Sequence, residues 1–329
     1  MADSKPLVLV LGGTGHTGRS IVNGLLNAGN FRVAVLVRPT SVTKPATEVL
    51  KASGVEIRVG SLTDDFGKLK QYVQGVDILI SAVDARVVGE QREIFRAAKE
   101  VGVQRVVPCD WGTPGRKGVR MLFDVKLDIR EYVQELGVGY TIIDVGWWMQ
   151  LFLPLPLRST VAQQFKEMSW KITGAGDIKN LLTNLDHIGT WVAKIIADPR
   201  TLNKYVIVWE DERPQNDAHE IGARVSGDGD ALRAKRIQLS EEDVKKQIAE
   251  GQAAYEKDPS DFNKGIRKII WGQYMTSLYL LRENTLENAK HLGYLDAREL
   301  YPDVPAQSLE EFAKEFYSLL EPGETFVRE

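Results

Sequence analysis

Three glycines at three-residue spacing separate an apolar run from a helical pattern near the start of the chain. Residues 7–11 (LVLVL) form an unbroken apolar run, which is typical of a strand buried on both faces of a parallel sheet. Gly12, Gly15 and Gly18 follow, and apolar residues then recur at helical spacing over residues 20–27. This order predicts a strand, a tight turn and a helix whose first N–H groups face a phosphate. The alternative is a turn that is merely rich in glycine.

The glycines of this turn have separate expected roles. Gly12 permits the tight turn, Gly15 lets the backbone approach a pyrophosphate, and Gly18 lets the helix pack closely on the strand. The positive end of the helix dipole favours the same phosphates. The turn therefore predicts a dinucleotide site, and its expected contacts are Gly12, Thr14, Gly15, His16, Thr17 and Gly18.

Strand and helix patterns alternate through the first 150 residues. After the first strand, further strands are expected over residues 32–37, 55–59, 76–82, 105–108 and 140–145. Helices are expected over residues 64–75, 90–101 and 123–136. This alternation predicts an α/β fold with a doubly wound parallel sheet.

The alternation fades after residue 150. Helices are expected over residues 186–197, 218–225, 240–252 and 309–320, and strands over residues 170–173 and 204–209. Ser240 and Asp243 form a loose capping box, and residues 262–281 carry many large apolar side chains. We expect a dinucleotide-binding domain of residues 1–150 and 185–212, and a smaller, partly helical substrate-binding domain of residues 151–184 and 213–329.

The composition argues against several other classes of protein. A net charge of −3 over 329 residues gives no basic field for nucleic acid or an anionic membrane. The single cysteine, Cys109, cannot form an intramolecular disulfide, and the four scattered histidines offer no zinc-ligand spacing. No signal-peptide core or membrane span is expected. We therefore expect a cytoplasmic protein, monomeric or homodimeric, with no metal, nucleic-acid or membrane partner.

The end of the second predicted strand indicates which dinucleotide is bound. An NAD-binding fold usually places an acidic residue there to bind the ribose hydroxyls. This strand ends instead at Arg38, and Lys44 follows soon after. Because a guanidinium matches the geometry of a 2′-phosphate, these residues predict NADP(H). The alternative is a solvated arginine.

The residues that follow the other strands are expected to contact the rest of the cofactor, because open α/β sheets bind ligands outside the carboxyl ends of their strands. These residues are Ser61, Leu62, Ser81, Ala82, Val83, Cys109 and Asp110. Cys109 is expected to be a small buried residue, since nothing beside it indicates an activated thiolate. Asp110 could orient a lysine or a water molecule.

Several segments together resemble one known family. They appear in the order GGTGHTG, GSLTDD, KQYVQGVDILISA, VVPCDWG, a lysine followed by IREYVQELGVGYT, and DHIGTWVAKIIADPRTLNK. In this order they resemble the NmrA-like, isoflavone-reductase-like branch of the atypical short-chain dehydrogenases. That branch includes the plant pinoresinol–lariciresinol, phenylcoumaran benzylic ether and isoflavone reductases. The resemblance runs from about residue 6 to about residue 250 and weakens beyond.

The resemblance implies an NADPH-dependent reductase with a Rossmann domain and a smaller C-terminal substrate domain. In the family, the lysine before the segment that matches IREYVQEL is the catalytic general acid or base, and by that match it is Lys126 here. Burial favours the neutral form of a lysine, which could then exchange a proton with a phenol or enol. Lys126 is also expected near the cofactor. The alternative is a solvated helix lysine among Asp124, Asp128 and Arg130.

Two functions remain open from the sequence. The first is a reductase of a small aromatic or phenolic compound. The second is a non-catalytic NADP(H) sensor, like the regulatory NmrA proteins, which generally lack the lysine at this place. The tyrosine of a Tyr-x-x-x-Lys pair is absent, since Leu122 stands four residues before Lys126. Oxidation of alcohols by that pair is therefore disfavoured.

An aromatic cluster is expected to wall the substrate pocket. Trp147, Trp148 and Met149 follow the sixth predicted strand, where they could instead pack between the domains. The expected substrate-binding residues are Trp111, Trp147, Trp148, Met149, Phe152 and Trp271. His16, Thr17, Trp111 and the Trp147–Trp148 pair depart from the plant pattern, and these differences concern the substrate more than the cofactor.

Overall fold

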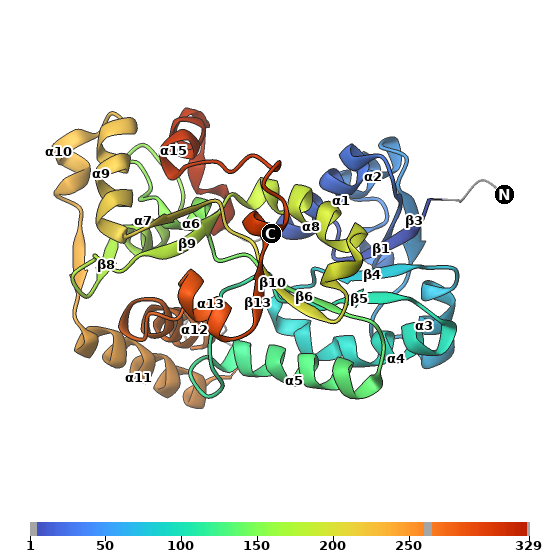
Figure 1. Cartoon of the computed structure of the whole chain (residues 1–329). Coiled ribbons are helices and arrows are strands. Elements are labelled where there is room, and N and C mark those ends of the chain that lie inside the picture. The colour runs from blue at the N-terminus through green and yellow to red at the C-terminus, as the bar shows by residue number, and fades with distance from the viewer. Residues whose placement is uncertain (1–4, 260–264, 328–329) are drawn as a thin grey trace.

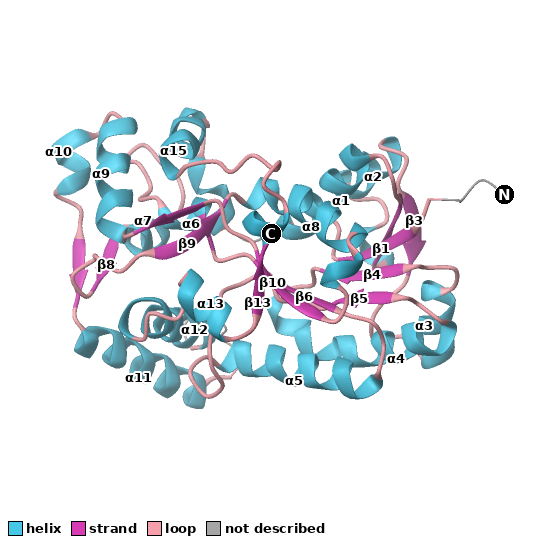
Figure 2. Cartoon of the chain, viewed as in Figure 1, coloured by secondary structure: helices cyan, strands magenta, loops and turns pink. Residues whose placement is uncertain are grey.

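A parallel sheet organises one half of the molecule in this computed structural model, which describes residues 5–259 and 265–327 (Figure 1, Figure 2). Five strands are hydrogen-bonded in the order β3-β2-β1-β4-β5, and three more in the order β13-β10-β6. A parallel bridge between Val106 and Tyr140 joins the two sets. Their bounds are β1 Leu7–Leu11, β2 Arg32–Val37, β3 Glu56–Val59, β4 Ile78–Ser81, β5 Arg105–Val107, β6 Thr141–Asp144, β10 Lys204–Ile207 and β13 Tyr294–Asp296. The predicted doubly wound parallel sheet is therefore confirmed.

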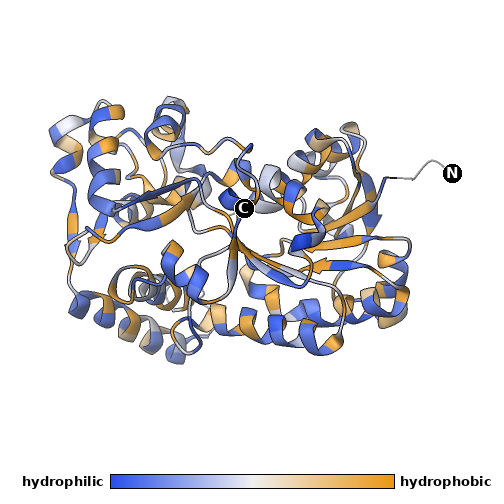
Figure 3. Ribbon diagram, viewed as in Figure 1, coloured by the Kyte–Doolittle hydropathy of each residue, from blue (hydrophilic) through white to orange (hydrophobic). Residues whose placement is uncertain are grey.

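Helices cover both faces of this sheet. One face carries α1 His16–Ala28 and α8 Ile188–Ala197, and the other carries α3 Phe66–Val73, α4 Arg92–Val101 and α5 Met121–Leu136 (Figure 1). The remaining helices of this half are α2 Pro45–Ala52, α14 Ala297–Leu300 and the short 3-10 turns η1 Pro39–Ser41, η2 Ala85–Gln91, η3 Leu185–His187 and η4 Pro199–Thr201. Every residue of β1 is buried, as the apolar run predicts, and Figure 3 shows the hydrophobic colour along the central strands.

Two glycines let α1 and α8 cross closely. A methyl group on Gly24 would lie 2.1 Å from the backbone of Gly189, and one on Gly189 would lie 1.8 Å from the carbonyl oxygen of Ser20. A side chain at either position would clash with the facing backbone. The two helices can therefore cross this closely only because both residues are glycine. Gly189 therefore fixes how the returning helix covers the sheet.

Gly189→Ala is expected to lower the free energy of unfolding by roughly 1–3 kcal/mol, because the methyl group overpacks this crossing. The matched control is Gly89→Ala, since the methyl group there would meet only Val125, at 4.0 Å. Urea denaturation of both variants measures the difference. Equal stability of the two variants would contradict the close crossing.

The second half of the molecule has its own small sheets and helices. Strands β7 Trp147–Trp148, β9 Asn180–Thr183 and β11 Asp211–Arg213 form one sheet, and β8 Lys171–Thr173 pairs with β12 Ile237–Leu239. The helices are α6 Met149–Phe152, α7 Gln163–Ser169, α9 Gln215–Val225, α10 Gly229–Arg233, α11 Glu241–Lys257, α12 Ile266–Met275, α13 Leu286–His291 and α15 Leu309–Ser318, with a π-turn η5 Thr276–Leu280 and a 3-10 turn η6 Pro322–Phe326. They enclose a second hydrophobic core. No helix among the described residues is long and apolar enough to cross a membrane.

The later elements agree with the sequence in part. Both hydrogen bonds of the capping box between Ser240 and Asp243 are present at the start of α11. Phe262, at the start of the apolar stretch, lies outside the described residues, and α12 begins at Ile266. Strand β13 was not expected: it comes from the segment assigned to the substrate-binding domain, yet it extends the parallel sheet beside β10. Three residues are too short for a periodic pattern, so its pairing depends on a partner distant in sequence. The domain boundaries otherwise stay a prediction.

Candidate active site

The glycine turn lies where the strand order of the sheet reverses, between β1 and β4. Gly12 has a φ of +74°, and a methyl group on it would lie 2.3 Å from the carbonyl oxygen of Ala82. A methyl group on Gly18 would lie 2.1 Å from the carbonyl oxygen of Gly12. Gly15 differs, because its methyl group would meet only Gly12, at 3.5 Å. The turn is thus closed toward β4 and open at Gly15, the N-cap residue directly before α1. This geometry fits a pyrophosphate at the helix N-terminus.

Polar side chains surround the turn. Thr14 is exposed and His16 is half-buried, while Thr17 is buried. The hydroxyl oxygen of Ser81, at the end of β4, is buried and has no hydrogen-bond partner within the described residues. An unpaired buried hydroxyl is costly unless a ligand or water bonds it. The donor set fits the phosphates and nicotinamide side of a dinucleotide.

The carboxyl ends of β2 and β3 bring the expected adenine-side residues to the same edge of the sheet. Arg38 follows β2 and Lys44 precedes α2, and both side chains are exposed. Within the described part of the chain, neither side chain makes a hydrogen bond or an ion pair. Ser61 and Leu62 follow β3 and are half-buried. Two unpaired cations beside the edge fit a 2′-phosphate.

A continuous set of contacts leads from the glycine turn to Lys126. Gly12 packs on Ala82, and the carbonyl oxygen of the next residue, Val83, accepts from the Cys109 thiol at 3.2 Å. The carbonyl oxygen of Asp110 then accepts a hydrogen bond from the Lys126 ammonium. Lys126 is buried on α5, with 9% of it exposed, so it is not the solvated lysine of the alternative interpretation. Its chemical role stays a prediction.

Burial also explains the state of Cys109. Only 7% of this residue is exposed, and burial raises the pKa of its thiol to about 12. A thiol with so high a pKa is protonated at neutral pH and is a poor nucleophile. Cys109 is therefore the small buried residue that the sequence predicts.

A buried cluster of charges lies beneath Lys126. One carboxylate oxygen of Asp110 accepts two bonds from the Arg130 guanidinium, at 2.7 and 3.0 Å. Arg130 also donates to Asp144, at 2.8 Å, and to the hydroxyl of Tyr294, which donates to Asp144 at 2.5 Å. Burial raises the pKa of Asp110, whereas for Asp144 the effect of burial is outweighed by Arg130 and Tyr294, which lower its pKa.

Sequence reasoning missed this cluster. In the sequence, Arg130 fits a charged, solvated helix face, and no motif singles out Asp144 or Tyr294. One signal was present, since Arg130 stands four residues after Lys126 and so shares its face of the helix. The partners come from β6 and β13, and no local pattern connects them with α5.

An aromatic cluster from β7 and α12 lies beyond Lys126. The ring of Trp147 packs edge-on against Trp271, with centroids 6.1 Å apart, and against Tyr274, with centroids 5.1 Å apart. All three rings are half-buried. The backbone N–H of Met121, at the start of α5, donates to the Gln273 side chain at 2.9 Å, so α12 abuts the helix that carries Lys126 (Figure 1).

The other expected substrate-binding residues lie in the packed interior. Trp111 is buried with a φ of 42°, and its indole N–H donates to the carbonyl oxygen of Ser81 at 2.7 Å. Met149 and Phe152 belong to the second hydrophobic core. Trp148 is half-buried against the first core, so the tryptophan pair also packs both halves together. Trp111, Met149 and Phe152 are thus packed in the two cores, and their expected contact with the substrate stays a prediction.

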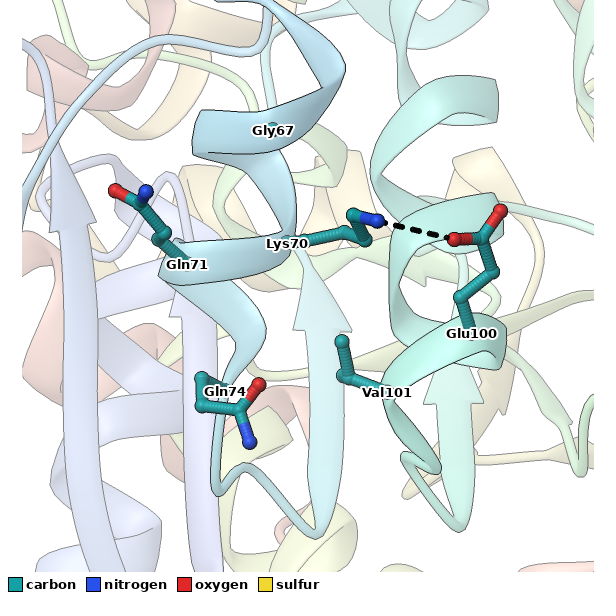
Figure 4. A pocket seen from close by; sticks show the side chains of 6 residues that line it. All are labelled: Gly67, Lys70, Gln71, Gln74, Glu100 and Val101. Atoms are coloured by element: carbon teal, nitrogen blue, oxygen red, sulfur yellow. Dashed lines mark ion pairs between the residues drawn. The ribbon is translucent and has the colours of Figure 1, made fainter.

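A surface hollow elsewhere contains none of the expected residues. Side chains of α3 and α4 line it, and an ion pair of 3.4 Å between Lys70 and Glu100 crosses it (Figure 4). Strand β4 begins shortly after α3 ends, and β5 begins shortly after α4 ends. Since both helices end near the hollow, the hollow lies toward the amino ends of β4 and β5. Ligands of open α/β sheets bind at the other edge.

Comparison with known proteins decides the family. The sequence model of the NmrA-like family matches residues 4–313. The chain belongs to the NmrA-like family. The match extends well past residue 250, where the resemblance in the sequence weakens.

Individual relatives cover almost all of this NmrA-like protein. It is 35% identical over 314 residues to the asnovolin J 5′,6′-dehydrogenase of Aspergillus novofumigatus, with 94% of each chain covered. It is 29% identical to a phenylcoumaran benzylic ether reductase of Pyrus communis, with 95% of this chain and 99% of the relative covered. Among solved structures, AtPrR2 with NADP+ and (+)-pinoresinol is similar with a TM-score of 0.75 at 26% identity, covering 95% of this chain and 99% of that one. The resemblance to the isoflavone-reductase-like branch is confirmed.

Proposed function

We propose that the chain is an NADPH-dependent reductase of a small aromatic or phenolic compound, with Lys126 as the general acid or base. The observation that supports this most is the burial of the Lys126 ammonium. On one side it bonds Asp110, which belongs to the set of contacts leading to the glycine turn, and on the other side lies the aromatic cluster. Related proteins support the class of reaction, since they include a benzylic ether reductase and a protein solved with NADP+ and pinoresinol.

The residues of the chain have separate tasks in this proposal. The glycine turn and Ser81 would bind the dinucleotide, and Arg38 and Lys44 its 2′-phosphate. The bound nicotinamide supplies a hydride. Lys126 holds or gives a proton at the oxygen of the substrate, and the aromatic rings of Trp147 and Trp271 exclude water from the reacting carbon.

The assay follows NADPH absorbance with the purified protein and a panel of isoflavones, lignans, phenylcoumarans and aryl enones. The reverse reaction with NADP+ is included, because one relative is named a dehydrogenase. Turnover of at least one compound is expected. Tight NADPH binding without turnover in either direction would favour the alternative, a non-catalytic NADP(H) sensor.

Arg38→Gln is expected to weaken NADPH binding by about 10–100-fold, since a charge-assisted hydrogen bond contributes roughly 1.5–3 kcal/mol. Affinity for NADH, which lacks the 2′-phosphate, should stay unchanged. Arg32→Gln is the matched control, because Arg32 is exposed at the opposite end of the same strand. Calorimetric titration with both dinucleotides measures the change. An equal loss of affinity for NADPH and NADH would contradict the assignment of Arg38 to the 2′-phosphate.

A further inference from the structure

The Lys126 ammonium and the Tyr274 hydroxyl approach each other at Gly112, a position whose backbone does not require glycine. Its φ lies outside the left-handed region that favours glycine. A methyl group on Gly112 would meet the carbonyl oxygen of Asp110 at 3.5 Å, the Lys126 ammonium nitrogen at 3.6 Å and the Tyr274 hydroxyl oxygen at 3.8 Å. These are ordinary contact distances, so an alanine could stand at this position without a clash. Lys126 and Tyr274 both approach Gly112, and both side chains can donate a proton.

The position of Tyr274 is held from two sides. Its ring packs edge-on against Trp147 with a centroid separation of 5.1 Å, and the guanidinium of Arg120 lies 5.0 Å from its centroid. Arg120 is itself buried and donates to the hydroxyl and carbonyl oxygens of Thr113 at 2.6 and 2.9 Å. The ring is therefore fixed by packing on both strand β7 and the loop after β5. A fixed ring places its hydroxyl without loss of rotamer freedom on binding.

The hydroxyl of Tyr274 makes no hydrogen bond to a group within residues 5–259 and 265–327. Tyr294, by contrast, donates to Asp144 and belongs to the buried charge cluster. Lys126 donates to the carbonyl oxygen of Asp110, and an ammonium group has three donors. Both groups thus keep the capacity to bond an oxygen atom placed beside Gly112.

We propose that Tyr274 is a second catalytic residue, which with Lys126 binds one oxygen of the substrate beside Gly112. This inference rests on the proposed reductase function and names its substrate class: an aromatic compound whose oxygen is conjugated with the carbon that receives hydride. Tyr274 donates a hydrogen bond to that oxygen, where negative charge develops.

In this step the substrate gains two electrons as hydride and one proton. A new C–H bond forms with hydride from NADPH, the conjugated π bonds shift, and the electron pair moves to the substrate oxygen. An O–H bond then forms with a proton from the Lys126 ammonium, which regains a proton from water. Tyr274 keeps its own proton throughout and stabilises the charge by its hydrogen bond.

Two variants test the proposal on a compound that the wild-type protein reduces. Tyr274→Phe keeps the packed ring and removes only the hydroxyl, so kcat should fall by about 10²–10³-fold with little change in KM. Gly112→Ala places a methyl group in contact with both Lys126 and Tyr274, where it excludes the substrate oxygen, and should lower kcat/KM by about 100-fold. Both variants should bind NADPH and unfold thermally as the wild type does.

The matched control is Tyr132→Phe, which removes a hydroxyl from another half-buried ring that lies beside an arginine. Its kcat should equal that of the wild type. Wild-type turnover together with a kcat of Tyr274→Phe within a few-fold of the wild type would overturn the role of Tyr274 and leave the reductase function standing. Undiminished kcat/KM in Gly112→Ala would place the substrate oxygen elsewhere. Absence of turnover by the wild type on every compound would overturn both proposals.

Discussion

Lys126→Met is expected to lower kcat by at least about 100-fold while the affinity for NADPH stays unchanged, because general acid or base catalysis contributes roughly 10²–10⁴-fold. The buried position of Lys126 makes methionine a suitable replacement, since its flexible thioether fills the space of the alkyl chain. The variant removes the ammonium that donates to Asp110 and leaves the glycine turn intact. Steady-state kinetics and NADPH titration of the same preparation separate catalysis from cofactor binding.

The matched control for this variant is Lys117→Met. Lys117 lies on the exposed loop before α5, and its ammonium pairs with Asp128 at 3.4 Å in solvent. Its loss should leave kcat at the wild-type value. A kcat of Lys126→Met within a few-fold of the wild type would show that Lys126 is not the general acid or base, whatever compound the protein reduces.

Arg130→Met is expected to lower the free energy of unfolding by about 3–5 kcal/mol, the usual cost of removing one partner from a buried ion pair. The guanidinium is 3% exposed and bonds both Asp110 and Asp144, so its loss leaves two buried carboxyl groups with only the Lys126 ammonium as a counter-charge. Urea denaturation measures the change.

Arg96→Met is the control for the stability measurement, because the Arg96–Glu93 pair, at 2.6 Å, is exposed. An exposed ion pair contributes about 0–1 kcal/mol, so this variant should remain close to the wild type. A loss below about 1 kcal/mol in Arg130→Met would mean that the two carboxyl groups are protonated or hydrated in the folded protein.

The local parts of the fold could be predicted from the sequence. Strand β1, the glycine turn and α1 form one continuous segment, and their apolar period and glycine spacing are local signals. The ends of the parallel strands meet at one edge by topology, so Arg38 and Ser61 could be assigned to the same site before the structure was known.

The parts that depend on contacts distant in sequence could not be predicted. Lys126 was recognised from family resemblance, but its burial depends on how α5 packs between the sheet and α12. Tyr274 and Gly112 come from different halves of the chain, and no pattern connects them. Trp111 follows a strand as a pocket residue would, yet its backbone conformation turns the indole inward to Ser81.

The pairing of β13 with β10 has a consequence for how the protein is made. Residues 294–304, far in sequence from the other strands, complete the first core, since Ala297, Tyr301 and Val304 pack into it and Tyr294 bonds Asp144 and Arg130. On the ribosome, the sheet therefore lacks its edge strand, and Arg130 its tyrosine, until residues 294–296 have been synthesised. A nascent chain of residues 1–212 would hold the glycine turn and Lys126 and still be an unfinished domain, exposed to chaperones and proteases until β13 emerges.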